Sequence, residues 1–314
     1  MLQNLVPDLA PNDSRLLIHA PFGVVLLLGS FFGGCGDAVF DPPIECDFCV
    51  DWNQPQEPFR IFANTYYVGV AGLSSILIDT GDGLVLIDGG LPQSATLIHE
   101  SIRKLGFDIK DVSLILVSHV HFDHVGGIAA LQRLSGATVL TSNAGKSSLD
   151  IGMLEDNDPQ FSVAAKESWF PACSGVRAVF DEEILQLGDT EIRALYTPGH
   201  TPGGISWTWL SCDGHECLNV VYADSLSPIS ADGYMFSTAP RIAADNLKNS
   251  AKIIAALKCD IFLSNHPFRF DMKAKLVKNG DANPFVDTGA CINYADSSLA
   301  SLQRRLTAEE QSLH

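Results

Sequence analysis

The chain has 314 residues, of which 46% are hydrophobic, so it can bury one large core or two modest ones. Its formal net charge at neutral pH is −17. Binding to nucleic acid needs clustered lysine and arginine, so this acidic composition argues against a nucleic-acid partner.

The N-terminal region contains an apolar run from Ala20 to Phe32. The run is too short to span a bilayer and is typical of a signal-peptide core. It leads into Phe32-Gly33-Gly34-Cys35, which is similar to a bacterial lipoprotein cleavage box, although a phenylalanine replaces the usual aliphatic residue. We expect residues 1–34 to be a signal peptide or lipoprotein leader and residues 35–50 to be a linker, with Cys35 as a candidate lipid anchor and a periplasmic location. A buried N-terminal strand is the alternative.

The predicted strands and helices begin at Phe59, where apolar and polar residues start to alternate. Three strands separated by glycine-containing turns are predicted at residues 60–70, 74–79 and 84–88. Helices and strands then follow in turn at residues 93–105, 114–117, 126–134, 138–141 and 144–149. Residues 151–174 are irregular, which is typical of a loop that overhangs a pocket.

The second half repeats this order of elements. Strands are predicted at residues 176–180, 191–197, 205–210 and 218–222, and a helix, a strand and a final helix at residues 243–257, 261–263 and 294–310. Because each half places helices after a strand meander, we predict two sheets packed face to face with helices outside. No linker separates the halves, so residues 51–314 are predicted to form one domain.

The eight cysteines favour an exported protein, because disulfides persist in oxidising compartments. Cys212 and Cys217 bracket a polar turn that a disulfide could close. Cys259 and Cys291 lie far apart in the sequence, and a bridge between them would tie down the C-terminal segment. The remaining pairings stay open, and they involve Cys46, Cys49 and Cys173.

Five histidines and one aspartate form a metal-ligand signature. It opens with residues 118–124, which read Ser-His-Val-His-Phe-Asp-His. Two histidines two positions apart project the same way from a strand end or its following loop, whereas a helix would separate them by about 200°. The segment is therefore predicted to be a strand-to-helix loop that presents four ligands, His119, His121, Asp123 and His124.

Two later histidines complete the signature. His200 follows the strand predicted at 191–197, and His266 follows the apolar residues 261–263. Loops at the carboxyl ends of strands commonly carry the chemistry of layered α/β folds. Neutral imidazoles together with one carboxylate suit zinc, so all six side chains are predicted to bind metal.

These motifs resemble the metallo-β-lactamase superfamily. The resemblance covers about residues 51–305, and the chain looks most like the third subclass of class B β-lactamases. The phrases similar to that subclass are residues 51–55, 197–204, 222–227 and 283–287. The resemblance implies a four-layer αβ/βα sandwich with a dinuclear zinc centre.

The resemblance also implies how the ligands divide between the metals. The first two subclasses place a zinc-ligating cysteine where this chain has Ser225, and the second replaces the first histidine, which here is intact as His119. Ligation is therefore expected to follow the third subclass, with two Zn²⁺ per chain and with Asp123 also orienting the nucleophile. The two ligand sets are His119, His121 and His200, and Asp123, His124 and His266.

Several other polar residues have an implied role and a plainer alternative. Ser225 and Ser227 correspond to serines that order a metal-side water and the substrate carboxylate, or else they satisfy loop backbone groups. Gln160 either reaches the substrate from the irregular loop or is solvent-exposed. Asp88 either bonds a ligand histidine or ends a strand. Asp224 is ambiguous, because lactonases and glyoxalase II use an aspartate in this region to bridge both metals.

The function implied by the resemblance is hydrolysis of the β-lactam amide in penicillins, cephalosporins and carbapenems, which confers antibiotic resistance. Attack by a hydroxide shared between two zinc ions is expected to need no covalent intermediate. One alternative is another hydrolase on the same scaffold, a lactonase or a glyoxalase II-like thioesterase. A second is a metal-binding protein without catalysis. The expected partner is a small-molecule lactam, and the chain is predicted to be a monomer.

Overall fold

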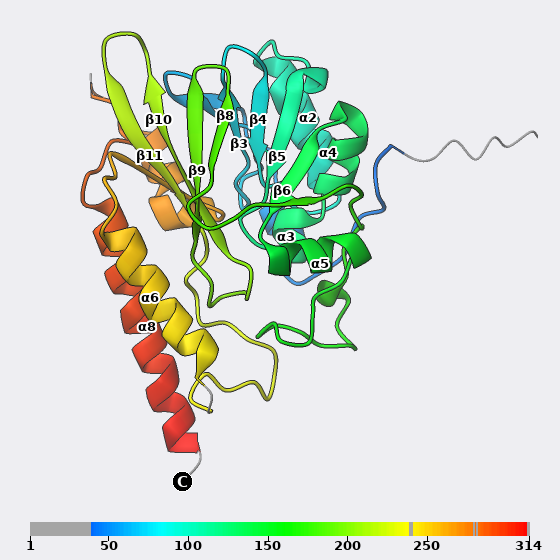
Figure 1. Ribbon diagram of the computed structural model, residues 1–314, viewed down its shortest axis with the longest axis vertical. Helices are drawn as coiled ribbons and strands as arrows, with labels where there is room; N and C mark the ends of the chain where they lie inside the picture. Colours follow the sequence, from blue (N-terminus) through cyan, green and yellow to red (C-terminus); the bar gives the residue numbers. More distant parts are fainter. Residues whose placement is uncertain (1–38, 239–240, 279, 281, 313–314) are drawn as a thin grey trace, which may run out of the picture. The chain divides into compact units, whose positions relative to one another are not determined.

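The computed structural model describes residues 39–238, 241–278, 280 and 282–312. The predicted leader and Cys35 lie outside the described residues. Figure 1 shows two β-sheets packed face to face, with helices on the outer side of each. The four-layer αβ/βα sandwich that the sequence predicts is confirmed.

The first sheet has seven strands in the order β1-β2-β3-β4-β5-β6-β7. Pairing is antiparallel from β1 to β4 and parallel from β4 to β7. The single strand predicted at residues 60–70 is wrong, because a turn at Ala63, with φ of 43°, divides it into two. The strands are β1 Phe59–Phe62, β2 Thr65–Tyr67, β3 Ile76–Asp79, β4 Leu84–Ile87, β5 Val112–Leu116, β6 Thr138–Thr141 and β7 Arg177–Ala178.

The second sheet has five strands in the order β12-β11-β10-β9-β8. All neighbours pair antiparallel except β11 and β12, which are parallel. The sequence did not predict β8, a short edge strand in which only Leu185 is buried. The strands are β8 Ile184–Leu187, β9 Thr190–Tyr196, β10 Ile205–Cys212, β11 Cys217–Ala223 and β12 Ile261–Ser264.

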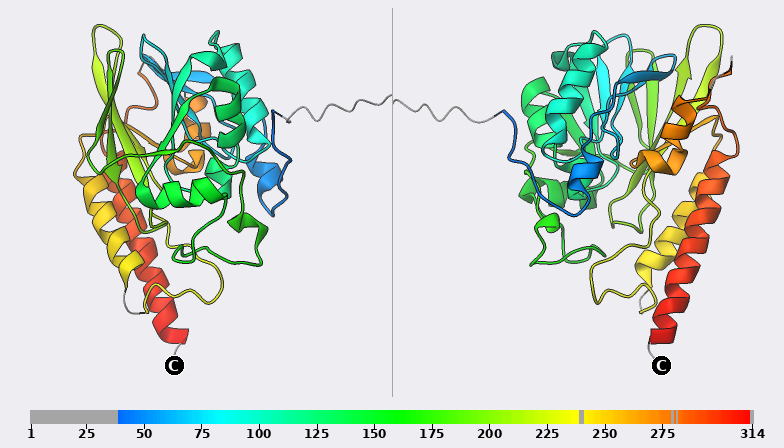
Figure 2. Two further views of the ribbon diagram at one scale, coloured as in Figure 1. Left: turned by 45° about the vertical axis from the view of Figure 1, so that its right-hand side comes forward. Right: turned by 180° about the vertical axis from the view of Figure 1, so that it is seen from behind.

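The outer layers are helical, with α2 and α4 on the first sheet and α6 and α8 on the second (Figure 2). The long helices are α2 Ser94–Lys104, α4 Ile128–Ser135, α5 Asn143–Ile151, α6 Ile242–Ala255 and α8 Ala290–Ser312. The short ones are α1 Cys49–Trp52, α3 Phe122–Val125 and α7 Met272–Leu276, with 3₁₀ turns η1 Ile109–Asp111, η2 Lys166–Ser168 and η3 Pro267–Phe270. In the described part of the chain, no helix has the length and apolarity needed to cross a membrane.

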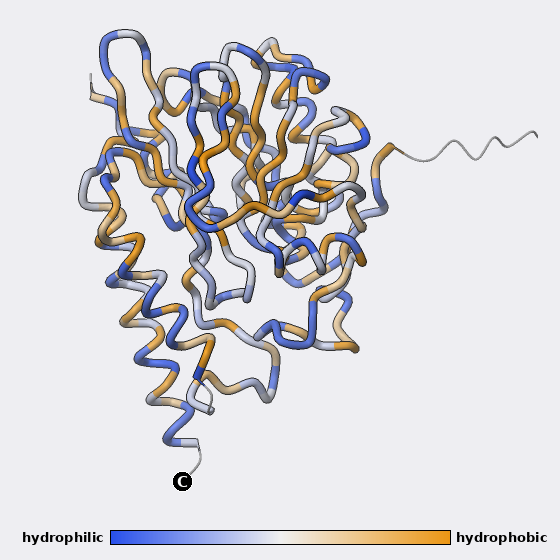
Figure 3. The backbone as a smooth tube through the Cα atoms, viewed as in Figure 1, coloured by the Kyte–Doolittle hydropathy of each residue, from blue (hydrophilic) through white to orange (hydrophobic). Residues whose placement is uncertain are grey.

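Alternating side chains of the first sheet divide the interior into two cores. Ile76, Ile78 and Val85 are buried between the sheets, whereas Leu77 and Leu86 are buried beneath the outer helices. Strand side chains alternate between the two faces, so a slip of one residue would exchange the two sets. Hydrophobic residues accordingly run along the central strands in Figure 3, while the loops that join them are mostly hydrophilic.

The segment predicted as a linker packs on the helical layer where it is described. Arg133 of α4 donates to the carbonyl of Val39 and pairs with Asp41 at 2.7 Å. Gln93 exchanges two hydrogen bonds with the backbone of Ile44. This segment therefore contacts both α2 and α4 before α1 begins.

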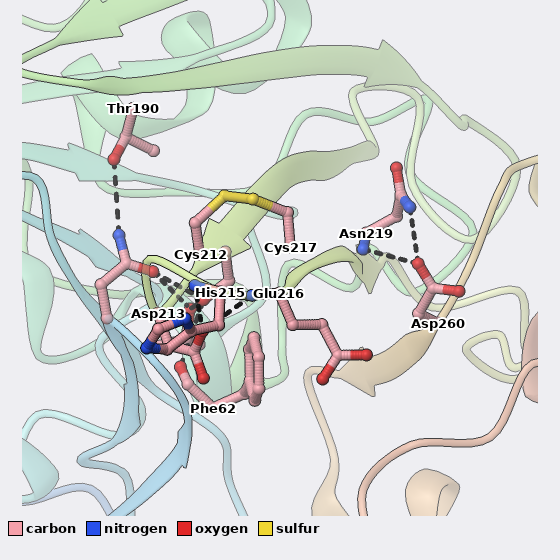
Figure 4. The surroundings of a disulfide bond; sticks show 12 residues. Phe62, Thr190, Cys212, Asp213, His215, Glu216, Cys217, Asn219 and Asp260 are labelled. Carbon is pink, nitrogen blue, oxygen red and sulfur yellow. Dashed lines mark hydrogen bonds between the residues drawn. A yellow bond between two sulfur atoms is a disulfide. The ribbon is translucent and has the colours of Figure 1, made fainter.

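Three disulfides are present among the described residues, and two of them are the bridges that the sequence suggests. Cys212–Cys217 closes the hairpin between β10 and β11, where the Asp213 carboxylate also accepts from two backbone amides of the turn (Figure 4). Cys259–Cys291 joins a residue two positions before β12 to the first turn of α8. The third is Cys46–Cys49, and Cys173 is buried without a partner in this part of the chain.

The Cys259–Cys291 bridge closes a longer chain segment than Cys212–Cys217, with sequence separations of 32 and 5. Replacing Cys259 and Cys291 by serine should therefore lower the free energy of unfolding by about 3–4 kcal/mol, because the unfolded chain gains loop entropy. The same replacement at Cys212 and Cys217 should cost only about 2 kcal/mol. Urea denaturation of the zinc-loaded proteins measures both losses, and a larger loss for the short loop would contradict the entropic explanation.

Candidate metal centre

The predicted ligands lie on loops at one end of the sandwich. The loop between β5 and α3 carries His119 and His121, and the first turn of α3 carries Asp123 and His124. His200 follows β9, and His266 follows β12. Both sheets therefore contribute ligands from the carboxyl ends of their strands.

The six side chains form two clusters of three, with the same division that the resemblance implies. In each cluster, one possible ligand atom from every residue lies within 4.8 Å of the others. Five of the six side chains are buried, and His266 is only partly exposed. The clusters adjoin, since the His119 and His124 ring centroids are 4.4 Å apart. The clusters are His119, His121 and His200, and Asp123, His124 and His266.

The spacing of these atoms suits zinc. Asp123 Oδ2 lies 3.2 Å from His124 Nε2 and 3.5 Å from His266 Nε2. Ligands held tetrahedrally at 2.0–2.1 Å from a zinc ion are about 3.3 Å apart. In the other cluster, His119 Nε2 is buried and has no hydrogen-bond partner, as expected of an atom that binds a metal. The residues present therefore fit a zinc centre.

Metal binding needs neutral imidazoles, and burial favours that state at three of the five histidines. His124 differs, because the Asp123 carboxylate outweighs burial there and raises the pKa. Burial lowers the pKa of His200 to about 3 and that of His266 to about 4. Burial, with nearby histidines, holds the pKa of His119 well below its ordinary value. Burial alone would raise the pKa of Asp123, but His124 and His266 outweigh it and keep this carboxyl ionised.

Two buried carboxylates orient histidines of the first cluster through the ring nitrogen that faces away from the cluster. Asp224 Oδ1 lies 2.7 Å from His119 Nδ1. Asp158 Oδ1 lies 3.2 Å from His121 Nε2 and also accepts from the backbone N–H of Gln160. Such acceptors fix the tautomer and the direction of a metal-binding ring.

Backbone carbonyls do the same for two further rings. His200 Nδ1 lies 2.8 Å from the carbonyl oxygen of Ser227, and His266 Nδ1 lies 3.2 Å from that of Gly72. These contacts leave Nε2 of both histidines directed to the clusters.

One of the two roles predicted for Asp88 was a hydrogen bond to a ligand histidine. Among the described residues, its carboxylate instead bonds Ser118 and Tyr222. Its backbone has a φ of 58°, and its carboxylate accepts from the amide and the hydroxyl of Ser118 at 2.8 and 2.6 Å. It also accepts from the hydroxyl of Tyr222 at 2.7 Å. Asp88 therefore fixes the residue at which the ligand loop begins.

The three residues predicted to bind substrate line one cavity of about 420 Å³ beside the clusters. Gln160 Nε2 lies 3.3 Å from His121 Nδ1 and 3.4 Å from His200 Nε2. Ser225 Oγ donates to Ser227 Oγ at 3.2 Å. Trp52 and Phe122 supply apolar wall to the same cavity.

The sequence did not identify Asp158 or Arg269 as parts of this site. Asp158 lies in the irregular segment, and nothing in its sequence context marks a contact with His121. Arg269, three residues after His266, donates from Nη2 to Ser227 Oγ at 2.6 Å and lines the cavity. Its guanidinium also lies 4.9 Å from the centroid of the Phe268 ring. The only sequence signal for Arg269 is its nearness to a ligand histidine.

The sandwich and its paired histidine clusters define a metal-dependent hydrolase fold, and comparison with known proteins identifies the family. Residues 68–213 match the model of the metallo-β-lactamase superfamily. MEM-A1, a subclass B3 metallo-β-lactamase from a soil metagenome library, is 45% identical with a TM-score of 0.80, over 83% of this chain and 100% of that one. The Rm3 metallo-β-lactamase is 43% identical with a TM-score of 0.81, over 85% and 100%. The chain belongs to the metallo-β-lactamase superfamily, and over most of its length it is similar to subclass B3 enzymes.

Curated relatives match over shorter segments. The uncharacterized protein YobT of Bacillus subtilis (strain 168) is 30% identical over 46% of this chain and 59% of its own length. The N-acyl homoserine lactonase AttM of Agrobacterium fabrum is 27% identical over 33% of this chain and 38% of its own length. The chain thus spans less than two thirds of the length of each of these relatives.

Replacing Asp158 by alanine should weaken zinc binding at the three-histidine cluster by about 10- to 100-fold, because His121 loses the acceptor that orients its ring. The affinity is measured by competition with a chromophoric chelator. Asp156→Ala is the matched control, since this exposed neighbour has the same charge and no contact with the cluster. Equal affinities of the Asp158 and Asp156 variants would exclude the orienting role.

Proposed function

We propose that this protein hydrolyses the amide bond of β-lactam antibiotics with two zinc ions bound at the paired clusters. Bound zinc supplies a nucleophile at neutral pH and stabilises the developing oxyanion. Support comes from the similarity to a subclass B3 metallo-β-lactamase over 83% of the chain and from the complete set of six ligand side chains.

Other side chains around the clusters orient the attacking water and bind the substrate. The ionised Asp123 carboxylate accepts a hydrogen bond from the attacking water and so orients it. Ser225 and Ser227 line one wall of the cavity, where they bind the carboxylate of the lactam, and Arg269 orients Ser227 by donating to its hydroxyl. The Gln160 amide, close to two ligand histidines, bonds the substrate from the overhanging loop.

The position of Asp224 is the observation that favours β-lactam hydrolysis over the alternative of a lactonase or a glyoxalase II-like thioesterase. Those enzymes are expected to bridge both metals with an aspartate in this region. Here Asp224 is fully buried and bonds His119 through Nδ1, so the imidazole ring lies between this carboxylate and the metal-facing Nε2. The carboxylate supports one ligand instead of joining two metals.

The purified protein should hydrolyse a carbapenem and a chromogenic cephalosporin, lose both activities with a chelator and regain them with zinc. Asp123→Asn should lower kcat/KM by at least about 100-fold, because it removes both a ligand and the orienting acceptor. Asp156→Asn, which changes an exposed residue of the same charge, is the control.

Two results would contradict the proposal. Hydrolysis of a homoserine lactone or a thioester but of neither lactam would favour the alternative hydrolase. A covalent acyl-protein in mass spectra of the reacting mixture would exclude direct hydrolysis, for which no side-chain nucleophile is needed.

We also propose that the protein is exported to the periplasm and acts there as a monomer, with Cys35 as a lipid anchor. The three disulfides support an oxidising compartment. Fractionation of cells that express the full chain should place it in the periplasm or at the membrane, and Cys35→Ser should release membrane-bound protein. Recovery in the cytosol with reduced cysteines would contradict export, and light scattering of the purified protein tests the monomer.

A further inference from the structure

A second cavity, of about 430 Å³, adjoins the metal cavity. It lies between residues 226–229 and one side of α8. Ser227, Ile229 and Arg269 line both cavities. A molecule bound at the metal clusters can therefore extend along this shared wall into the second cavity.

The wall formed by α8 is polar and cationic. Ser297, Ser301 and Arg304 recur every three or four residues, which places them on one side of the helix. Ser298 and Arg305 lie beside them on the same wall. No aspartate or glutamate lines this cavity, although the chain as a whole carries a net charge of −17.

Two of the three arginines in this cavity have no countercharge. Arg305 is already neutralised, since its Nε lies 2.5 Å from Glu309 and its Nη2 donates to Ser230 at 2.8 Å. Arg269 and Arg304 have no carboxylate within 4.0 Å in the described ranges of the chain. A guanidinium group without a neighbouring carboxylate is free to bind the carboxylate or phosphate-like group of a ligand, because its N–H donors form a planar fork.

Acidic side chains of the metal cavity also favour binding of an anion in the second cavity. Asp47 and Glu167 line that cavity on the side of α1 and the irregular loop. An anionic group is repelled there and attracted towards Arg269. The acidic side chains thus line only the metal cavity, whereas Arg304 lines only the second one.

We propose that the second cavity is an anion subsite, in which Arg304 and Arg269 bind a negatively charged substituent of a lactam whose ring lies at the metal clusters. The inference rests on the proposed function. In a cephalosporin the ring carboxylate and the C3 substituent are on adjacent atoms. A carboxylate held at Ser225 and Ser227 therefore directs the C3 substituent towards the shared wall.

The test uses the full-length, zinc-loaded protein and two cephalosporins that differ only in whether the C3 substituent carries a carboxylate. Arg304→Gln should raise KM for the extra-charged compound by about fivefold and leave KM for the other within twofold. Arg103→Gln removes the same charge from an exposed position on α2 and should leave both values unchanged. Equal effects of Arg304→Gln on the two compounds, or none, would overturn the subsite.

A binding measurement separates failure of the subsite from failure of the proposed function. Calorimetric titration with inorganic sulfate should show binding that Arg304→Gln weakens about fivefold and Arg103→Gln does not. If neither cephalosporin is hydrolysed, the proposed function fails, and the sulfate titration still decides whether this cavity binds anions. If the two variants bind sulfate with the same affinity, the anion site is overturned. If Arg304→Gln weakens sulfate binding but affects both cephalosporins equally, the cavity binds anions and its assignment to the substrate is overturned.

Discussion

Five imidazoles and a carboxylate can be buried together only if the rings that bind metal stay uncharged and keep a fixed direction. Burial supplies the first condition for two of the rings, since it lowers the pKa of His200 to about 3 and that of His266 to about 4. At His124 burial acts in the same direction, but the neighbouring Asp123 carboxylate outweighs it and raises the pKa. The second condition needs an acceptor for the other nitrogen of a ring. Four of the five histidines have one, and the acceptors are Asp224, Asp158 and the carbonyls of Ser227 and Gly72.

Those acceptors come from segments far apart in the chain, so the metal centre depends on closure of the whole sandwich. His119 follows a strand of the first sheet, whereas Asp224 follows β11 of the second. The same junction is held by Tyr222, which donates to Asp88, and by the indole of Trp207, which donates to the carbonyl of Val117 at 3.2 Å. These bonds fix the spacing between the sheets at the end where the ligands lie. A change in how the sheets pack would therefore alter the direction of a metal ligand.

The ligands could be predicted because their chemistry is local. A His-x-His spacing, an aspartate and a strand end together indicate a metal-binding loop. The contribution of Asp158 could not be predicted, because it depends on how the irregular loop folds back over His121. The strand β8 was missed for a related reason, since an edge strand with one buried residue has little hydrophobic alternation. The break at Ala63 requires a positive φ that is uncommon for alanine, and no sequence pattern signals it.

Asp224 shows how one aspartate can serve different chemistry on this scaffold. The choice between bridging two metals and supporting one histidine depends on which side of the His119 ring the carboxylate occupies. Here the space for the carboxylate is provided by Gly204, where any Cβ would overlap Asp224 Oδ2. Asn265 adds a second constraint, since its amide lies 3.3 Å from Asp224 Oδ1 and 3.2 Å from His119 Nδ1. Gly204, four residues after His200, and Asn265, directly before His266, thus hold Asp224 against Nδ1 of His119, so that residues near the ligands determine its role.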